Sequence, residues 1–336
     1  MSLELGLALD FGTQQAPLAD WLDSYTPILE RAEKLGFHSV VAGQSLPAGP
    51  SFHLPSPLLV LAALSTRTNM GLGTGVTLMP AWGAYQLAYD GAMLDQLTRG
   101  RAYFGISVSN PGDWRRFGLD RATVGRRFDD LLQAVKTLWN GGTEFRGEHV
   151  SVEQGIWPLP VQTGGPPLLT GGLAGVSARR AALLADGYYA ATQYHLEEVR
   201  RQARRYHEEV AAAGRPAGTI AMNRLLFLAD SREQAFREGG EYVTSVLRRY
   251  ASMGAIKHQQ NGQLESVDRA DPHILDRVLG RVALVGTPED AVGWLREYEA
   301  AGVTRVLLRV RPADMPPPLV QQTVTLAGEQ VLPTFR

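Results

Sequence analysis

The sequence contains no cysteine. This absence excludes disulfide bonds, thiolate nucleophiles and cysteine-ligated metal centres. The 336 residues carry a formal net charge of only -1, so neither sign is in excess. A balanced charge does not favour a nucleic acid or an acidic membrane surface as a partner, and we expect the partner to be a small molecule.

Long apolar runs are also missing. The N-terminal residues lack the basic segment and apolar run of a signal peptide, and no later stretch approaches the ~18 uninterrupted apolar residues of a membrane span. We therefore expect a cytoplasmic protein with no membrane segment. The sequence also lacks the phosphate-binding Walker A loop and the G-x-S-x-G nucleophile elbow. These absences argue against catalysis by side chains alone.

Histidines are few, and their spacing does not favour a metal site. None of the seven forms an HxH or HExxH pattern: they are His38, His53, His149, His195, His207, His258 and His273. His53 and His195 follow predicted strands and could face a pocket, although a lone loop histidine is more often simply solvated. No bound metal is expected.

What the sequence does contain is a repeated alternation of buried strands and amphipathic helices. Strands are predicted at residues 3–9, 37–42, 71–78, 101–107, 167–170, 187–190, 220–228 and 303–310. Helices are predicted at residues 20–35, 57–65, 85–97, 122–139, 176–185, 196–213, 232–250 and 290–301. Eight such units favour an α/β fold of the TIM barrel type, formed as one domain by residues 1–336, over an open doubly wound sheet.

Two segments interrupt this alternation, and we expect insertions near residues 141–160 and 254–285. Residues 143–152 alternate in the manner of a hairpin outside the repeat. Residues 257–271 are polar and include Asn261 and Gly262, which predicts a mobile loop and a candidate cover for the site.

The third predicted strand holds three glycines, Gly71, Gly73 and Gly75. Glycine weakens a strand interior, so this cluster indicates either a bulge or the close approach of a flat ligand to the backbone. The alternative is a glycine-rich strand that serves packing alone. The spacing does not match a dinucleotide fingerprint, because the glycines lead into more strand and not into a helix.

Two further segments follow the ends of predicted strands. Residues 170–177 include Gly171, Gly172 and Gly175 and open a helix, so their N–H groups could cradle a phosphate, although an ordinary tight loop is equally consistent. After the fourth strand come Ser107, Ser109 and Asn110, which could donate to a cofactor or simply form a turn.

Short segments spread along most of the chain resemble the bacterial luciferase-like monooxygenase family of flavin- or deazaflavin-dependent oxidoreductases. They are Ala-Glu-Lys-Leu-Gly-Phe-His-Ser-Val at residues 32–40, Leu-Gly-Thr-Gly-Val at 72–76, Leu-Asp-Gln-Leu-Thr-Arg-Gly-Arg at 94–101, Gly-Arg-Arg-Phe-Asp at 125–129, Gly-Gly at 171–172, Ala-Asp-Gly at 185–187 and Val-Gly-Thr-Pro-Glu at 285–289.

The resemblance implies where a cofactor would bind. In the family a strand-three bulge carries a non-prolyl cis peptide behind the flavin ring, which by position falls at Gly75-Val76. The implied cofactor-binding residues are Thr74, Gly75, Val76, Ser107, Val108, Ser109, Gly171, Gly172, Leu173, Val176 and Ser177. The catalytic residue stays unknown, with Gln44, His53 and Asn110 as candidates.

One departure from the family pattern bears on the cofactor. Where many relatives place an acidic residue and a histidine after the second strand, this chain has Gln44-Ser45. We therefore expect FMN as the cofactor, with the deazaflavin coenzyme F-420 as the alternative.

The implied function is that of a two-component FMN-dependent monooxygenase, which uses reduced flavin from a separate reductase and oxygen to oxidise a small organic substrate. A homodimer is expected. The alternatives are a deazaflavin-dependent hydride transfer, a non-catalytic flavin-binding protein and a flavin-free barrel that binds a phosphorylated metabolite.

Overall fold

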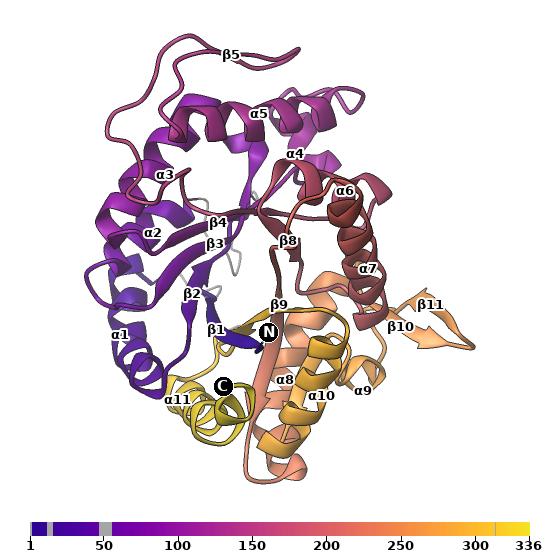
Figure 1. The fold of residues 1–336 in the computed structure, drawn as a ribbon. Helices are drawn as coiled ribbons and strands as arrows, with labels where there is room; N and C mark the ends of the chain where they lie inside the picture. Colours follow the sequence, from indigo (N-terminus) through magenta and orange to yellow (C-terminus); the bar gives the residue numbers. More distant parts are fainter. Residues whose placement is uncertain (1, 12–15, 47–55, 313) are drawn as a thin grey trace.

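A computed structural model describes residues 2–11, 16–46, 56–312 and 314–336. Eight parallel strands close into a barrel, because β13 pairs with β1 and β8 pairs with β9 (Figure 1). In ring order they are β1 (Glu4–Leu9), β2 (Ser39–Ala42), β3 (Gly71–Leu78), β4 (Ala102–Ser107), β7 (Leu168–Thr170), β8 (Gly187–Ala190), β9 (Thr219–Leu228) and β13 (Arg305–Arg309). The predicted TIM barrel and all eight of its strands are confirmed.

Helices surround the barrel (Figure 1). The predicted ones are α1 (Leu18–Leu35), α2 (Pro57–Leu64), α3 (Ala84–Thr98), α5 (Val124–Trp139), α6 (Gly175–Leu184), α7 (Leu196–Ala212), α8 (Arg232–Ala251) and α10 (Pro288–Ala300). Helix α1 ends at Gly36, whose φ of 87° is the left-handed cap expected of glycine. Helix α10 begins with a capping box, in which Thr287 and Asp290 each bond the other's backbone N–H.

Three short helices were not predicted: α4 (Pro111–Arg116), α9 (Ile274–Val278) and α11 (Pro317–Leu326). A further strand, β12 (Ala283–Gly286), was also missed and pairs with the second half of β9. It lies outside the closed ring, because β13 pairs with the first half of β9. Its short apolar run lies between α9 and α10, outside the eight strand-helix units that the sequence pattern indicates.

Two antiparallel hairpins lie outside the barrel. The predicted one is formed by β5 (Phe145–Arg146) and β6 (Ser151–Val152). The segment expected to be a mobile loop is instead a second hairpin, of β10 (Lys257–Gln260) and β11 (Gln263–Ser266). Its turn residues Asn261 and Gly262 both have positive φ, and an Asn-Gly pair is the preferred sequence for such a turn. The hairpin extends away from the barrel (Figure 1).

Aliphatic and aromatic side chains fill the barrel interior. They form a cluster of Ala8, Val41, Tyr103, Leu169, Tyr189, Ala221 and Leu307, against which Val76 packs. The layer between barrel and helices is a second, larger apolar cluster. No helix in the described ranges is long and apolar enough to cross a membrane.

Candidate active site

A cavity of about 130 Å³ lies at the C-terminal ends of the barrel strands. It is lined by Gln44, Gly75, Val76, Ile106, Ser107, Gly171, Tyr189, Ala191, Thr192, Gln193, Tyr194, Asn223 and Tyr250. A larger cavity, of about 390 Å³, lies at the opposite end beside Glu4 and Arg305. Chemistry in TIM barrels is located at the C-terminal face, so position and lining, not size, identify the candidate site.

Five of the residues predicted from the sequence meet in this cavity: Gln44, Gly75, Val76, Ser107 and Gly171. They come from the ends of β2, β3, β4 and β7, which are neighbours in the ring. Barrel closure therefore brings together segments that are up to 127 positions apart in the sequence, from residue 44 to residue 171.

The bulge predicted on β3 is present. The peptide bond Gly75-Val76 is cis, and the register with β4 shifts between Thr74 and Thr77. Both carbonyl groups of this bulge are held by the surrounding strands. The Asn223 amide donates to the Gly75 carbonyl at 3.1 Å, and the Gln44 backbone N–H donates to the Val76 carbonyl at 2.8 Å.

Gln44 fixes the bulge in a second way. Its side-chain oxygen accepts hydrogen bonds from the Thr77 hydroxyl and the Leu78 N–H, both at 2.7 Å. The side chain is almost fully buried, and an amide satisfies these donors without introducing a charge. Gln44 is therefore a support for the cavity wall.

The β3 glycines make room for interior side chains. A Cβ at Gly73 would lie 2.6 Å from the Tyr103 ring, and a Cβ at Gly75 would lie 2.5 Å from the Tyr189 hydroxyl. That hydroxyl donates to Asn223 at 2.7 Å, which orients the amide toward Gly75. Packing accounts for Gly73, whereas Gly75 both packs and lines the cavity.

The segment after β4 forms a turn and a helix cap. The Asn110 side chain accepts from the N–H groups of Gly112 and Asp113 at the start of α4. Ser109 has a φ of 67° and bonds the Asp113 carboxylate, while the Val108 carbonyl accepts from the Trp114 indole at 2.7 Å. These contacts favour the turn-forming interpretation for Ser109 and Asn110.

Residues 171–177 form the β7–α6 loop and the first turn of α6, and Gly171 of this segment lines the cavity. Gly172 has a φ of 153°, and its carbonyl accepts from the Tyr188 hydroxyl at 2.8 Å. The Gln202 side chain, from α7, donates to the Leu173 carbonyl at 2.9 Å. Both bonds are made to carbonyl groups of the loop, so neither uses a backbone N–H group.

The start of α6 suits an anion. Its N-cap is Ala174, with no side-chain cap and no acidic residue in the first turn. An Arg205 nitrogen would lie 2.7 Å from a Cβ placed on Gly175, so a guanidinium borders the helix start. Uncapped N–H groups, the helix dipole and a cation together favour a phosphate. Ser177 is buried in this turn, whereas Val176 is 54% exposed.

Other predicted residues have different roles. Thr74 is buried and donates to the Gly105 carbonyl at 2.8 Å. His195 caps α7 by accepting from the Glu197 N–H, and burial lowers its pKa to about 4. His53 lies outside the residues that the structure describes.

Sequence reasoning missed a buried polar network beside the cavity. Arg309 and Asp10 form an ion pair at 2.8 Å with neither side chain exposed. Arg309 also donates to the Tyr250 hydroxyl at 2.9 Å and contacts the Thr192 hydroxyl at 3.4 Å. Burial lowers the pKa of Arg309, but Asp10 outweighs it, so the arginine stays charged. A charged residue inside the apolar strand at 303–310 was the available clue.

The comparisons with known proteins agree with this geometry. The family model of the luciferase-like monooxygenases matches residues 4–305. The oxygenase component of a flavin-dependent trigonelline monooxygenase from Acinetobacter baylyi is 25% identical over 299 residues, which cover 83% of this chain and 81% of that protein. A 5,10-methylenetetrahydromethanopterin reductase from Archaeoglobus fulgidus is 22% identical over 83% of this chain and 87% of its own length.

Solved structures show the same fold. A monooxygenase from Streptomyces bottropensis superposes with a TM-score of 0.85 at 24% identity, covering 99% of this chain and 100% of that one. The oxygenating constituent of 3,6-diketocamphane monooxygenase from Pseudomonas putida, in complex with FMN, gives 0.78 at 19% identity, with 100% and 99% covered. The chain thus belongs to the luciferase-like monooxygenase family and is an oxidoreductase that uses a flavin-type cofactor.

Proposed function

We propose that the protein is the oxygenase of a two-component monooxygenase, which takes reduced FMN from a separate reductase and uses oxygen to oxidise a small organic substrate. The main observation is that one cavity joins the β3 bulge at Gly75 and Val76 to Gly171, next to the start of α6, which has no side-chain cap. A flat ring at the first and a phosphate at the second match the two ends of FMN.

The residues fit this ligand. We assign the phosphate to the N–H groups of residues 171–176, with the Ser177 hydroxyl and Arg205 beside it, and the ring to the face of Gly75 and Val76. Bound FMN supplies the redox chemistry, whereas the protein binds, orients and shields it. Tyr250 lines the same cavity, and its hydroxyl accepts from Arg309, so its own proton is free to be donated toward the cavity.

A reductase partner is part of the proposal because the similar protein from Acinetobacter baylyi is named an oxygenase component. The alternative cofactor is the deazaflavin coenzyme F-420. It is supported by a structure of a coenzyme F-420-dependent tetrahydromethanopterin reductase from Methanopyrus kandleri, with a TM-score of 0.72. The substrate of the monooxygenase reaction is proposed only as a small organic molecule.

The test compares the two cofactors directly. Purified protein is titrated with FMN and with coenzyme F-420, and oxygen uptake is then followed after photoreduced FMN and candidate substrates are added. The proposal expects FMN binding and oxygen consumption coupled to substrate. If the protein binds only coenzyme F-420 and consumes no oxygen, the proposed function becomes deazaflavin-dependent hydride transfer instead.

We also propose that the protein is a homodimer. Tyr89, Met93 and Leu97 are exposed at four-residue spacing, on one face of α3. The neighbouring segment adds Trp157, which is 83% exposed, and Val161, and it is tied to α3 by a bond from Gln96 to the Leu159 carbonyl. Exposed apolar patches of this kind mark protein interfaces. Met93→Glu should convert a dimer to a monomer in light scattering, and a monomeric wild type would contradict the assignment.

A further inference from the structure

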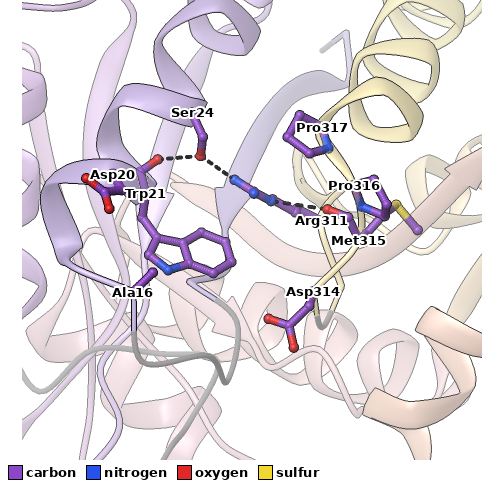
Figure 2. Close-up of a pocket in the computed structure, with 9 residues that line it drawn as sticks. All are labelled: Ala16, Asp20, Trp21, Ser24, Arg311, Asp314, Met315, Pro316 and Pro317. Atoms are coloured by element: carbon purple, nitrogen blue, oxygen red, sulfur yellow. Dashed lines mark hydrogen bonds between the residues drawn. The ribbon is translucent and has the colours of Figure 1, made fainter.

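A second cavity, of about 220 Å³, lies between the first turns of α1 and α11. Figure 2 shows Arg311, which follows β13, extending across it from the α11 side to Ser24 on α1. Trp21, Met315 and Pro317 supply apolar walls. None of these residues belongs to the cavity that holds the proposed flavin site.

Arg311 is a buried cation with few polar partners. Its side chain is on a residue only 7% exposed, and it donates to the Ser24 hydroxyl at 2.7 Å and, at 3.4 Å, to the Met315 carbonyl. The guanidinium stacks 4.2 Å above the Trp21 ring and lies 5.0 Å from that of Tyr25. Within the described part of the chain, no carboxylate lies within 4.0 Å of it.

The nearby tyrosine does not supply the missing negative charge. Burial raises the pKa of Tyr25 far above its usual value, and the charge of Arg311 and its hydrogen bond to the Tyr25 hydroxyl only partly oppose this shift. The Tyr25 hydroxyl is therefore neutral and is already bonded to the Asp10 backbone. Tyr25 therefore does not neutralise the Arg311 guanidinium.

Two other buried arginines, Arg309 and Arg224, show how protein groups compensate the charge of a buried guanidinium. Arg309 has a bidentate carboxylate partner, Asp10. Arg224 donates to the Tyr298 hydroxyl and to the backbone carbonyls of Thr192, Tyr194, Asn223 and Arg281. A buried charge without such partners is costly. Among the described residues, Arg311 has no carboxylate partner and fewer carbonyl partners than Arg224, and it borders an open cavity.

We propose that this cavity binds the carboxylate of a small organic acid, with Arg311 as its cationic partner and the apolar walls around the rest of the molecule. A planar carboxylate matches the guanidinium fork. A phosphate is disfavoured because α11 opens with Pro317 and Pro318, which have no N–H to donate. Asp20 and Asp314 also line the cavity, and their charges repel a doubly charged phosphate more strongly than a singly charged carboxylate.

The experiment measures binding directly, so it does not depend on the flavin proposal. Benzoate, the neutral analogue benzamide and inorganic phosphate are titrated calorimetrically into the whole protein. We expect benzoate to bind at least about tenfold more tightly than either of the others, because only benzoate has one negative charge and an apolar ring. Arg311→Gln should weaken benzoate binding by a similar factor.

A second variant keeps Arg311 but supplies a carboxylate from the protein itself, so that no ligand carboxylate is needed to pair with the guanidinium. Ser24→Asp places a carboxylate where the Ser24 hydroxyl now accepts from Arg311. We expect this variant to lose benzoate binding, with an unchanged or raised melting temperature. Arg31→Gln, which alters an arginine of α1 that pairs with Glu329, is the control and should bind benzoate normally.

Three outcomes would overturn the proposal: no benzoate binding by the wild type at millimolar concentration, equal binding of benzamide, or unchanged benzoate binding in Ser24→Asp. A parallel FMN titration separates the two assignments. Loss of FMN binding with benzoate binding intact would remove the flavin proposal and leave this one.

Discussion

The β3 segment and the β7–α6 loop are both rich in glycine and both border the flavin cavity, but their glycines answer different needs. In β3, Gly73 and Gly75 give space to Tyr103 and Tyr189, so the barrel interior itself requires them. In the loop, Gly172 adopts a φ of 153° and precedes a helix with no side-chain cap. At Gly171 the loop is packed as well, because an added Cβ would lie 1.9 Å from the Tyr189 carbonyl oxygen. In β3, stability and ligand binding are therefore coupled, whereas at the start of α6 a substitution can alter ligand binding with less effect on stability.

The largest effect should come from a charge in the loop. Ser177→Glu puts a carboxylate in the first turn of α6, where it stabilises the helix but repels a phosphate. We expect FMN affinity to fall by about 100-fold, or about 2.7 kcal/mol, relative to Ser177→Gln. Ser177 is buried, so both larger side chains cost some stability, and the comparison with Gln isolates the effect of the charge. Fluorescence quenching measures the affinity, and Ser177→Gln is the neutral control. Ser177 is preferable to Gly172, whose positive φ would strain any side chain.

In β3 the dominant effect should be on stability. Gly73→Ala forces a methyl group to within 2.6 Å of the Tyr103 ring, which is buried and bonded to Ser39. Overpacking of this kind costs about 1–3 kcal/mol, which denaturant unfolding would measure. Gly293→Ala is the control: nothing lies near its added Cβ on α10, so it should be neutral or slightly stabilising. Equal stability of Gly73→Ala and Gly293→Ala would contradict the claim that packing in the barrel requires Gly73.

A smaller effect should follow from loosening the support of Gly75. Tyr189→Phe removes the hydroxyl that donates to Asn223 and leaves the amide oxygen of Asn223 unpaired. We expect a loss of about 1 kcal/mol of unfolding free energy and a decrease of roughly threefold in FMN affinity. A change in FMN affinity without any change in stability would contradict the coupling proposed for β3.

The last effect concerns the stability of the protein at acidic pH. Burial keeps the pKa of His195 at about 4 in the folded protein, below the ordinary value of 6.5. The unfolded chain therefore binds the proton first, and the stability contributed by neutral His195 is present above pH 6.5 and declines as the pH falls toward 4. His195→Asn keeps a good N-cap but does not titrate. Melting temperatures from pH 7 to pH 4.5 should fall less steeply in this variant than in the wild type.

The fold could be predicted because its determinants are local. Gly36 ends α1 in the left-handed conformation, and the Thr287-Pro288 pair opens α10, as their sequence patterns indicate. The hairpin at Asn261-Gly262 was open to the same reasoning but was interpreted as a loop, because its polar strands lack alternation.

The site could be predicted only where backbone conformation leaves a mark in the sequence, as at Gly75 and Gly171. The contacts of Asn223, Tyr250 and Arg311 depend on which strands become neighbours when the barrel closes. Gln44 was noticed as a departure from the family pattern, but its role as a support for the bulge required the bonds to Thr77 and Leu78.

The most direct test of the flavin assignment is a comparison of FMN with riboflavin, which lacks the phosphate. Both are titrated into the wild type and into Ser177→Glu. The account predicts that the wild type binds FMN at least about 30-fold more tightly than riboflavin, and that this preference is lost in the variant while riboflavin affinity changes little. Equal affinity of the wild type for FMN and riboflavin would contradict a phosphate site at the start of α6.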